Sequence, residues 1–222
     1  RSSDLAGTDR PSDRSSGQSL WIVIMPRDHR TIVADDLMPL EQYEIIRADK
    51  RSEAILRKKL TRIAVGPNAT AMFETWDSMW LQIQEMLRIE KGGEAQIPDE
   101  IAAYDPMVPK GSELTATILF EVPDPVRRDA FLRTIGGIEN HIFLKVGDEV
   151  VRARPEGDIE RTRESDGKAS AVHFMHFDFT PVAISAWKSG QGTIMLVMDH
   201  PNYGHAALIG EETRRFLAEE CF

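Results

Sequence analysis

A clear helical pattern of apolar residues runs from about Trp76 to Glu90. Apolar residues recur there three or four positions apart, as they do on a helix with one buried face. They are Trp76, Met79, Trp80, Ile83, Met86 and Leu87. We therefore predict a central helix with Trp76, Trp80, Ile83 and Leu87 in the core. Glu90 falls on the same face by its helical angle, so a carboxylate is expected where packing requires none.

Other segments alternate between apolar and polar residues or carry turn residues between short apolar runs, which is the pattern of strands and hairpins. Strands are expected at about 62–65, 69–73, 113–122, 170–179 and 193–198, with a hairpin over 141–154. Helices are expected at about 40–60, 97–104, 124–135, 181–188 and 211–220. Hairpins are too frequent for a regular alternation of strand and helix. The prediction is α+β: a single domain, mainly antiparallel sheet, with helices packed on one face.

The beginning of the chain has a different composition. Residues 1–19 are mostly Ser, Asp, Gly, Arg and Thr, and such a segment buries too little apolar surface to fold by itself. We assign residues 1–34 to an N-terminal arm, either a native disordered segment or a leader or cloning-derived extension, with Met25 as an alternative start. The single domain is expected over 35–222, and residues 1–24 should add little to its stability.

Charge and cysteine content exclude several classes of function. The formal net charge is −9, whereas nucleic-acid binding depends on clustered lysine and arginine. The one cysteine, Cys221, can form neither an intrachain disulfide nor an iron–sulfur site. No apolar run approaches the roughly 18–20 residues of a membrane-spanning helix. We expect an acidic cytoplasmic protein that binds neither nucleic acid nor a membrane.

Sequence motifs for phosphate binding, dinucleotide binding and a nucleophile turn are absent. The most promising polar segment is Asp199–His205, which follows an apolar strand and should lie at a sheet end, where sites are often built. Asp199, His200, Tyr203 and His205 could bind a metal or serve in acid–base chemistry. The alternative is a turn whose Asp and Asn side chains bond their own backbone.

A second polar group, Glu85, Arg88 and Glu90, lies at the end of the predicted central helix. If that helix packs across the sheet, these side chains would face Asp199, His200 and Tyr203 and line a pocket with perturbed pKa values. The alternative is a structural network of ion pairs.

The remaining histidine pair, His173 and His176, lies in a predicted strand. Residues three apart on a strand point to opposite faces. We therefore expect one of these histidines in the core and the other at the surface, with no shared metal.

Four segments together resemble one bacterial family, which is catalogued as domain of unknown function thirty-five hundred and one. They are Leu37–Arg47, Phe73–Glu90, Glu113–Thr117 and Asp199–Tyr203, and the resemblance extends from about Asp35 to the end. The family implies no established activity and no catalytic residues. Its genes often lie beside those of a rubrerythrin-like protein and an iron–sulfur oxidoreductase, which implies by association a role in peroxide defence or electron transfer.

Two functions follow from these patterns. The first is a non-catalytic accessory protein in a redox or peroxide-defence system, with the rubrerythrin-like protein or the iron–sulfur oxidoreductase as partner. The second is an enzyme or metal-binding protein with a carboxylate and histidine pocket at the sheet end, where His200 and His205 would be the metal ligands. The sequence does not identify which cofactor, if any, the protein uses.

Overall fold

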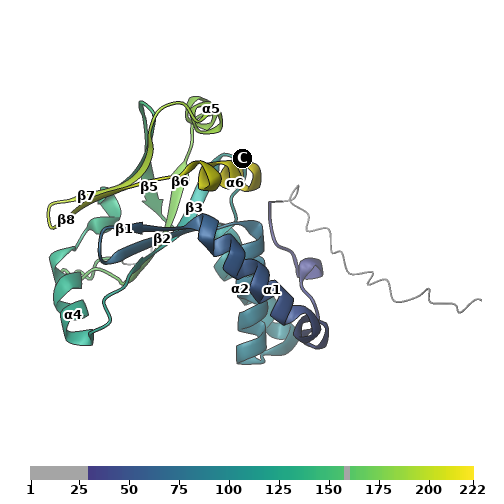
Figure 1. Cartoon of the computed structure of the whole chain (residues 1–222). Helices are drawn as coiled ribbons and strands as arrows, with labels where there is room; N and C mark the ends of the chain where they lie inside the picture. The colour runs from purple at the N-terminus through teal and green to yellow at the C-terminus, as the bar shows by residue number, and fades with distance from the viewer. Residues whose placement is uncertain (1–29, 158–160) are drawn as a thin grey trace, which may run out of the picture.

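The fold is built on one antiparallel sheet, seen in a computed structural model that describes residues 30–157 and 161–222 (Figure 1). Its strands follow the order β1-β2-β3-β6-β5-β4-β7-β8. Their bounds are β1 Arg62–Val65, β2 Ala69–Phe73, β3 Glu113–Phe120, β4 Ile142–Val146, β5 Glu149–Pro155, β6 Val172–Asp178, β7 Ile194–His200 and β8 Tyr203–Leu208. Together with the helices, this sheet confirms the α+β class.

The helices lie close to the predicted ranges. They are α1 Leu40–Thr61, α2 Trp76–Glu90, α3 Ile97–Tyr104, α4 Pro125–Thr134, α5 Pro181–Ser189 and α6 Glu211–Cys221. Side chains of Thr75, Asp124 and Thr180 cap the starts of α2, α4 and α5 by accepting backbone N–H groups, which satisfies donors that a helix start leaves unpaired. None of the helices in the described ranges is long and apolar enough to cross a membrane.

The sheet curls until its edge strands β1 and β8 approach each other. The Tyr203 hydroxyl donates to the carbonyl oxygen of Val65 at 2.8 Å and accepts the N–H of Asn68 at 3.0 Å. Gly66 has a φ of 71°, and a Cβ there would lie 2.5 Å from the ring of His205. Only glycine fits so close an approach at a positive φ without strain. These contacts bring the sheet nearly to a closed barrel.

The central strand β3 is buried on both faces. Leu114, Ile118 and Phe120 belong to the larger apolar cluster. Thr115 and Thr117 alternate with them and point to the opposite face. There the Thr115 hydroxyl donates to the carbonyl oxygen of Met107 at 2.6 Å. A second cluster is formed by Ile32, Tyr43, Trp76, Met79, Trp80, Ile83, Met107 and Val108.

The helices divide between these two clusters. Helix α2 belongs to the smaller cluster, whereas Trp187 of α5 and Leu217 of α6 belong to the larger one. In Figure 1, α1 and α2 lie together below the sheet, away from α5 at the top. The expected packing of all helices on one face is not confirmed, because a strand buried on both faces needs cover on both sides.

The register predicted for α2 is confirmed. Trp76, Trp80 and Ile83 are buried, and Leu87 packs at the edge of the same cluster. The Trp80 indole N–H donates to the carbonyl oxygen of Asp36 at 2.8 Å. Glu90 is exposed and accepts a hydrogen bond from Gln96, so the carboxylate expected on the packed face is not there. The last turn of α2 extends beyond the core.

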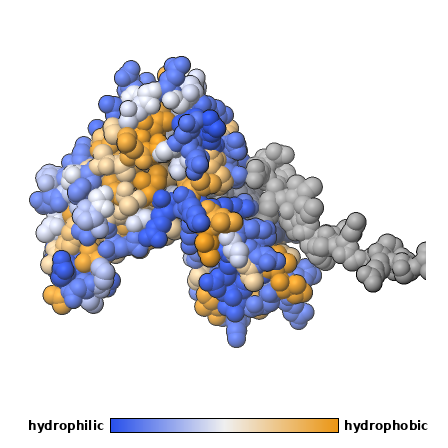
Figure 2. Space-filling view, viewed as in Figure 1, coloured by the Kyte–Doolittle hydropathy of each residue, from blue (hydrophilic) through white to orange (hydrophobic). Residues whose placement is uncertain are grey.

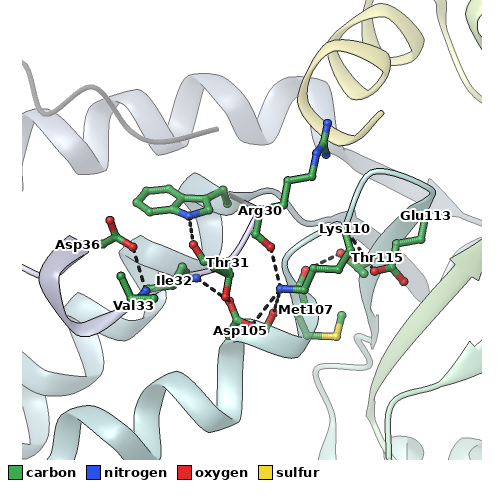
Figure 3. A network of polar contacts seen from close by, with 11 residues as sticks. Arg30, Thr31, Ile32, Val33, Asp36, Asp105, Met107, Lys110, Glu113 and Thr115 are labelled. Carbon is green, nitrogen blue, oxygen red and sulfur yellow. Dashed lines mark hydrogen bonds and ion pairs between the residues drawn. The ribbon is translucent and has the colours of Figure 1, made fainter. Parts of the chain in front are cut away.

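Part of the segment assigned to the N-terminal arm is packed against the domain (Figure 3). The N–H of Ile32 and the hydroxyl of Thr31 both donate to Oδ1 of Asp105, at 2.6 and 2.9 Å. Lys110 Nζ donates to the carbonyl oxygen of Arg30 and to the Asp105 carboxylate. The packed structure thus includes residues from Arg30 onward, not only from 35. Residues 1–24, which we expect to add little to stability, lie outside the described residues.

We predict that Trp80→Ala lowers the free energy of unfolding by about 3–5 kcal/mol, because it removes a large side chain from a closed core. Trp80 is 1% exposed. Chemical denaturation measures the change. Ile89→Ala on the same helix is the control: Ile89 is 62% exposed and should cost no more than about 0.5 kcal/mol. Equal losses in the two variants would contradict the packing described.

Candidate functional site

The residues predicted at the sheet end lie in the β7–β8 hairpin, whose turn is Pro201–Asn202. Nδ1 of His200 accepts the backbone N–H of Asn202 at 3.1 Å. The ring proton is therefore on Nε2, which donates to the carbonyl oxygen of Gly136 at 3.2 Å. With both nitrogens engaged, His200 is not free to bind a metal. The segment does form a turn, but the Asn202 side chain donates to the carbonyl oxygen of Thr134 and not to its own backbone.

The neighbours of His200 also have structural partners. Tyr203 joins the two edges of the sheet, and the ring of His205 packs on it at 4.5 Å between centroids. Asp199 lies at the surface and pairs with Nδ1 of His141 at 3.0 Å. His141 was not singled out by sequence reasoning, because it is distant in the chain from Asp199.

Glu85, Arg88 and Glu90 have their partners on the helical side of the molecule. Glu85 accepts the Tyr43 hydroxyl at 2.6 Å and pairs with Arg47 at 2.7 Å. The Arg47 guanidinium, with that hydroxyl, holds the pKa of Glu85 below its usual value. Arg88 pairs with Glu44 of α1 at 2.6 Å.

The two groups that were expected to face one another across a pocket are not brought together. In the described residues they share no hydrogen-bond partner, and Figure 1 draws α2 and the β7–β8 hairpin on different sides of the molecule. The helical group is instead the ion-pair network that was the alternative. The reason is that Tyr203 belongs to the larger apolar cluster, which the curled sheet encloses, whereas α2 belongs to the smaller cluster on the other face of the sheet.

His173 and His176 point to opposite faces of β6, as a strand requires. Both are buried, so the expectation of one at the surface is wrong. Burial lowers the pKa of His173. His176 lies between two carboxylates, with Nδ1 2.7 Å from Glu113 and Nε2 2.5 Å from Glu156. Burial lowers its pKa, but the bond to Glu113 and the negative charges outweigh burial, so the pKa of His176 is raised.

Cys221 and the acidic residues offer no recognisable redox or metal centre in the part of the chain that the structure describes. There, no group of three His, Cys, Asp or Glu side chains is placed to hold a metal ion. The Cys221 thiol is fully buried against the backbone of Glu74. Burial raises its pKa, which keeps it in the unreactive thiol form.

A cleft of about 340 Å³ opens between α1, α2 and β2, within the size range of small-ligand sites. Its lining includes the uncharged polar residues Thr61, Thr75, Ser78 and Gln82. The apolar residues are Ala54, Ile55, Met72, Phe73, Met79 and Leu81, and the charged ones are Arg51, Arg57, Lys58, Glu74, Asp77 and Glu85. Apolar walls with a few charged groups are typical of binding sites.

Glu74 is one of the two buried carboxyl groups of this cleft, the other being Asp77. It follows β2 directly and precedes the cap of α2, so its side chain lies between the sheet and the helix. Its oxygens accept the hydroxyls of Thr117 and Ser78, each at 2.6 Å. Burial raises the pKa of Glu74, an effect that exceeds the opposing one of the two hydroxyls. Sequence reasoning missed this residue because it tested residues of the helix, and Glu74 precedes it.

The charges of the cleft are unevenly compensated. Asp77 pairs with Arg57 at 2.7 Å, and Glu85 pairs with Arg47. Arg51 and Lys58, both on α1, have no hydrogen-bond or ion-pair partner among the described side chains. The electrostatic attraction of Lys58 to Glu74 and of Arg51 to Glu85 acts at longer range, so the cleft presents two cations without a direct partner beside an apolar lining.

The solvent face of α1 carries large aliphatic residues. Ile45, Ile55 and Leu56 are 81%, 61% and 62% exposed. Ile45 and Leu56 are separated by about three helical turns and so lie on one face. The limb that α1 and α2 form shows orange patches among blue ones, and a notch separates it from the limb of α4 (Figure 2). We call Ile45, Ile55 and Leu56 the α1 ridge.

By its fold the protein is α+β: a curled antiparallel sheet with the helix pair α1 and α2 packed beside it. The family model described as "Protein of unknown function (DUF3501)" matches residues 31–221, and the chain belongs to that family. A solved structure of a novel protein of unknown function from Burkholderia pseudomallei K96243 has 35% sequence identity and a TM-score of 0.79, covering 86% of this chain and 100% of that one. No curated protein matches the chain.

We predict that Glu74→Gln removes a pH dependence of stability. A carboxyl group whose pKa is raised by folding stabilises the fold least when it is ionised. Wild-type stability should therefore fall as the pH rises from about 4.3, the unfolded value, through the folded pKa. Gln has the same shape without the charge: its oxygen can accept one hydroxyl, and its amide N–H can donate to the oxygen of the other. Denaturation curves between pH 4 and 8 measure this, and parallel pH profiles of wild type and variant would contradict it.

His176 should produce a second pH dependence, in a different window. Its pKa is raised in the folded state, so its contribution is fully present below about pH 6.5 and is lost as the pH rises through the folded pKa. We predict that His176→Gln lacks this loss. If the stability of His176→Gln still falls as the pH rises through this range, His176 is not the cause of the fall.

Proposed function

We propose that this chain is a non-catalytic accessory protein of a redox system and that it docks a partner protein through the α1 ridge. The observation that carries the proposal is the exposure of Ile45, Ile55 and Leu56 on one helix. Ile55 and Leu56 are neighbours, Ile45 lies about three turns before Leu56 on the same face, and exposed aliphatic surface of this kind is a candidate for an interaction site. The proposed location is the cytoplasm, on the ground of the single cysteine.

The charges around the α1 ridge indicate the chemistry of the partner. The C-terminal half of α1 carries Arg51, Arg57, Lys58 and Lys59 against the single acid Glu53, although the whole chain has a net charge of −9. A basic and aliphatic helix on an acidic protein fits an acidic partner surface with apolar residues at its centre. Docking should therefore weaken as salt increases.

The accessory role is supported by the chemistry of Cys221. A buried thiol with a raised pKa is a poor nucleophile and a poor redox group, so electrons or peroxide would be handled by the partner. The association with a rubrerythrin-like protein and an iron–sulfur oxidoreductase rests on the family resemblance. These two proteins are thus the partners to test first.

We predict that one of these two partners binds the wild-type chain and that Ile45→Ser combined with Leu56→Ser weakens the affinity about tenfold or more. Burying two aliphatic side chains contributes about 1.5–3 kcal/mol each, and tenfold corresponds to about 1.4 kcal/mol. Isothermal titration with the purified partners measures it. Val182→Ser on α5, where Val182 is 63% exposed, is the control and should bind as the wild type does.

Two results would overturn the proposal. One is the absence of binding to both purified partners at low ionic strength. The other is binding that the α1 ridge variant and the Val182→Ser control lose equally, or that neither loses.

A further inference from the structure

The α1–α2–β2 cleft is separate from the α1 ridge in its chemistry. Ile55 and Leu56 are neighbours in sequence and equally exposed, but only Ile55 lines the cleft. The remaining apolar lining comes from the sheet and from α2, through Met72, Met79 and Leu81. An aliphatic group placed there would be covered on several sides, which is how small-ligand sites bury most of their ligand.

The cations of the cleft are arranged to act together. Arg51 and Lys58 are seven residues apart, which on a helix is about two turns and nearly the same face. Neither has a partner within the described ranges, and both line the cleft. Long side chains about 10 Å apart at their Cα atoms can converge on one anionic group.

The acids of the cleft do not cancel this charge. Asp77 and Glu85 are each neutralised by an arginine of α1. Glu74 is buried and bound by two hydroxyls, and burial favours its uncharged form. A cationic ligand would therefore meet Arg51 and Lys58 with no free acid to compensate. A ligand without charge would leave both cations unused.

We propose that the α1–α2–β2 cleft binds a small amphipathic anion, with its head group between Arg51 and Lys58 and its aliphatic body against Ile55, Met72 and Leu81. The site takes a carboxylate or a phosphate ester, since both present oxygens that arginine and lysine bind. This inference goes beyond the docking function and does not depend on it.

Binding of defined probes tests the proposal. Isothermal titration of the full chain is carried out with octanoate, octyl phosphate and octylamine, which share an aliphatic body and differ in the head group. At least one of the two anions should bind, and octylamine should bind about tenfold or more weakly, because a charged hydrogen bond contributes about 1.5–3 kcal/mol and tenfold is about 1.4 kcal/mol. The ratio of the two anion affinities identifies the head group.

Two adjacent residue pairs supply matched variants. Lys58→Gln and Ile55→Ser should each weaken anion binding, since both residues line the cleft. Lys59→Gln and Leu56→Ser change neighbouring exposed residues that do not line it, and should bind as the wild type does. These four positions are on the exposed side of α1, so the variants should fold, which thermal unfolding verifies.

Three outcomes would overturn the inference: neither anion binds, octylamine binds as well as the anions, or both members of a matched pair behave alike. The docking proposal is tested separately, because Leu56→Ser weakens partner binding and leaves anion binding unchanged. Absence of partner binding by the wild-type chain therefore counts against docking and not against the cleft.

Discussion

The burial of β3 on both of its faces is the constraint on which the architecture depends. One face is closed by the curl of the sheet and by α5 and α6, so the other face needs separate helices. Helix α2 supplies that cover with Trp76, Trp80 and Ile83, and Glu74 joins the helix start to the sheet through Thr117 and Ser78. The buried tryptophans and this carboxyl group hold the α1–α2 limb in place.

The same constraint creates the surfaces with functional potential. Because α2 packs against this face of the sheet, α1 contacts the domain along one side only. The α1 ridge is therefore left in solvent. The cleft lies where α1, α2 and β2 meet, and it carries cations because the acids of α2 are already paired with Arg47 and Arg57. Docking and anion binding are thus assigned to opposite edges of one helix, with Ile55 at the boundary.

Sequence periodicity was sufficient for the local elements. It predicted α2 and its buried residues, the hairpin β4–β5 and the opposite orientation of His173 and His176, because each depends on neighbours along the chain. It could not predict the role of Tyr203, which bonds residues 135 and 138 positions away. The packed segment from Arg30 was missed for the same reason, whereas strand β8 pairs locally with β7 and was missed because its first residues were interpreted as part of a turn or site. His200 and Glu90 looked functional only while their partners, Gly136, Asn202 and Gln96, were unknown.

The central claim is that α1 is the docking surface of an accessory protein. Hydrogen–deuterium exchange of the chain, alone and with a saturating amount of the redox partner that binds it, tests this claim most directly. The account predicts slower exchange in peptides from α1, Leu40–Thr61, and unchanged exchange in the β7–β8 hairpin. Protection confined to the hairpin, with α1 unchanged, would contradict it.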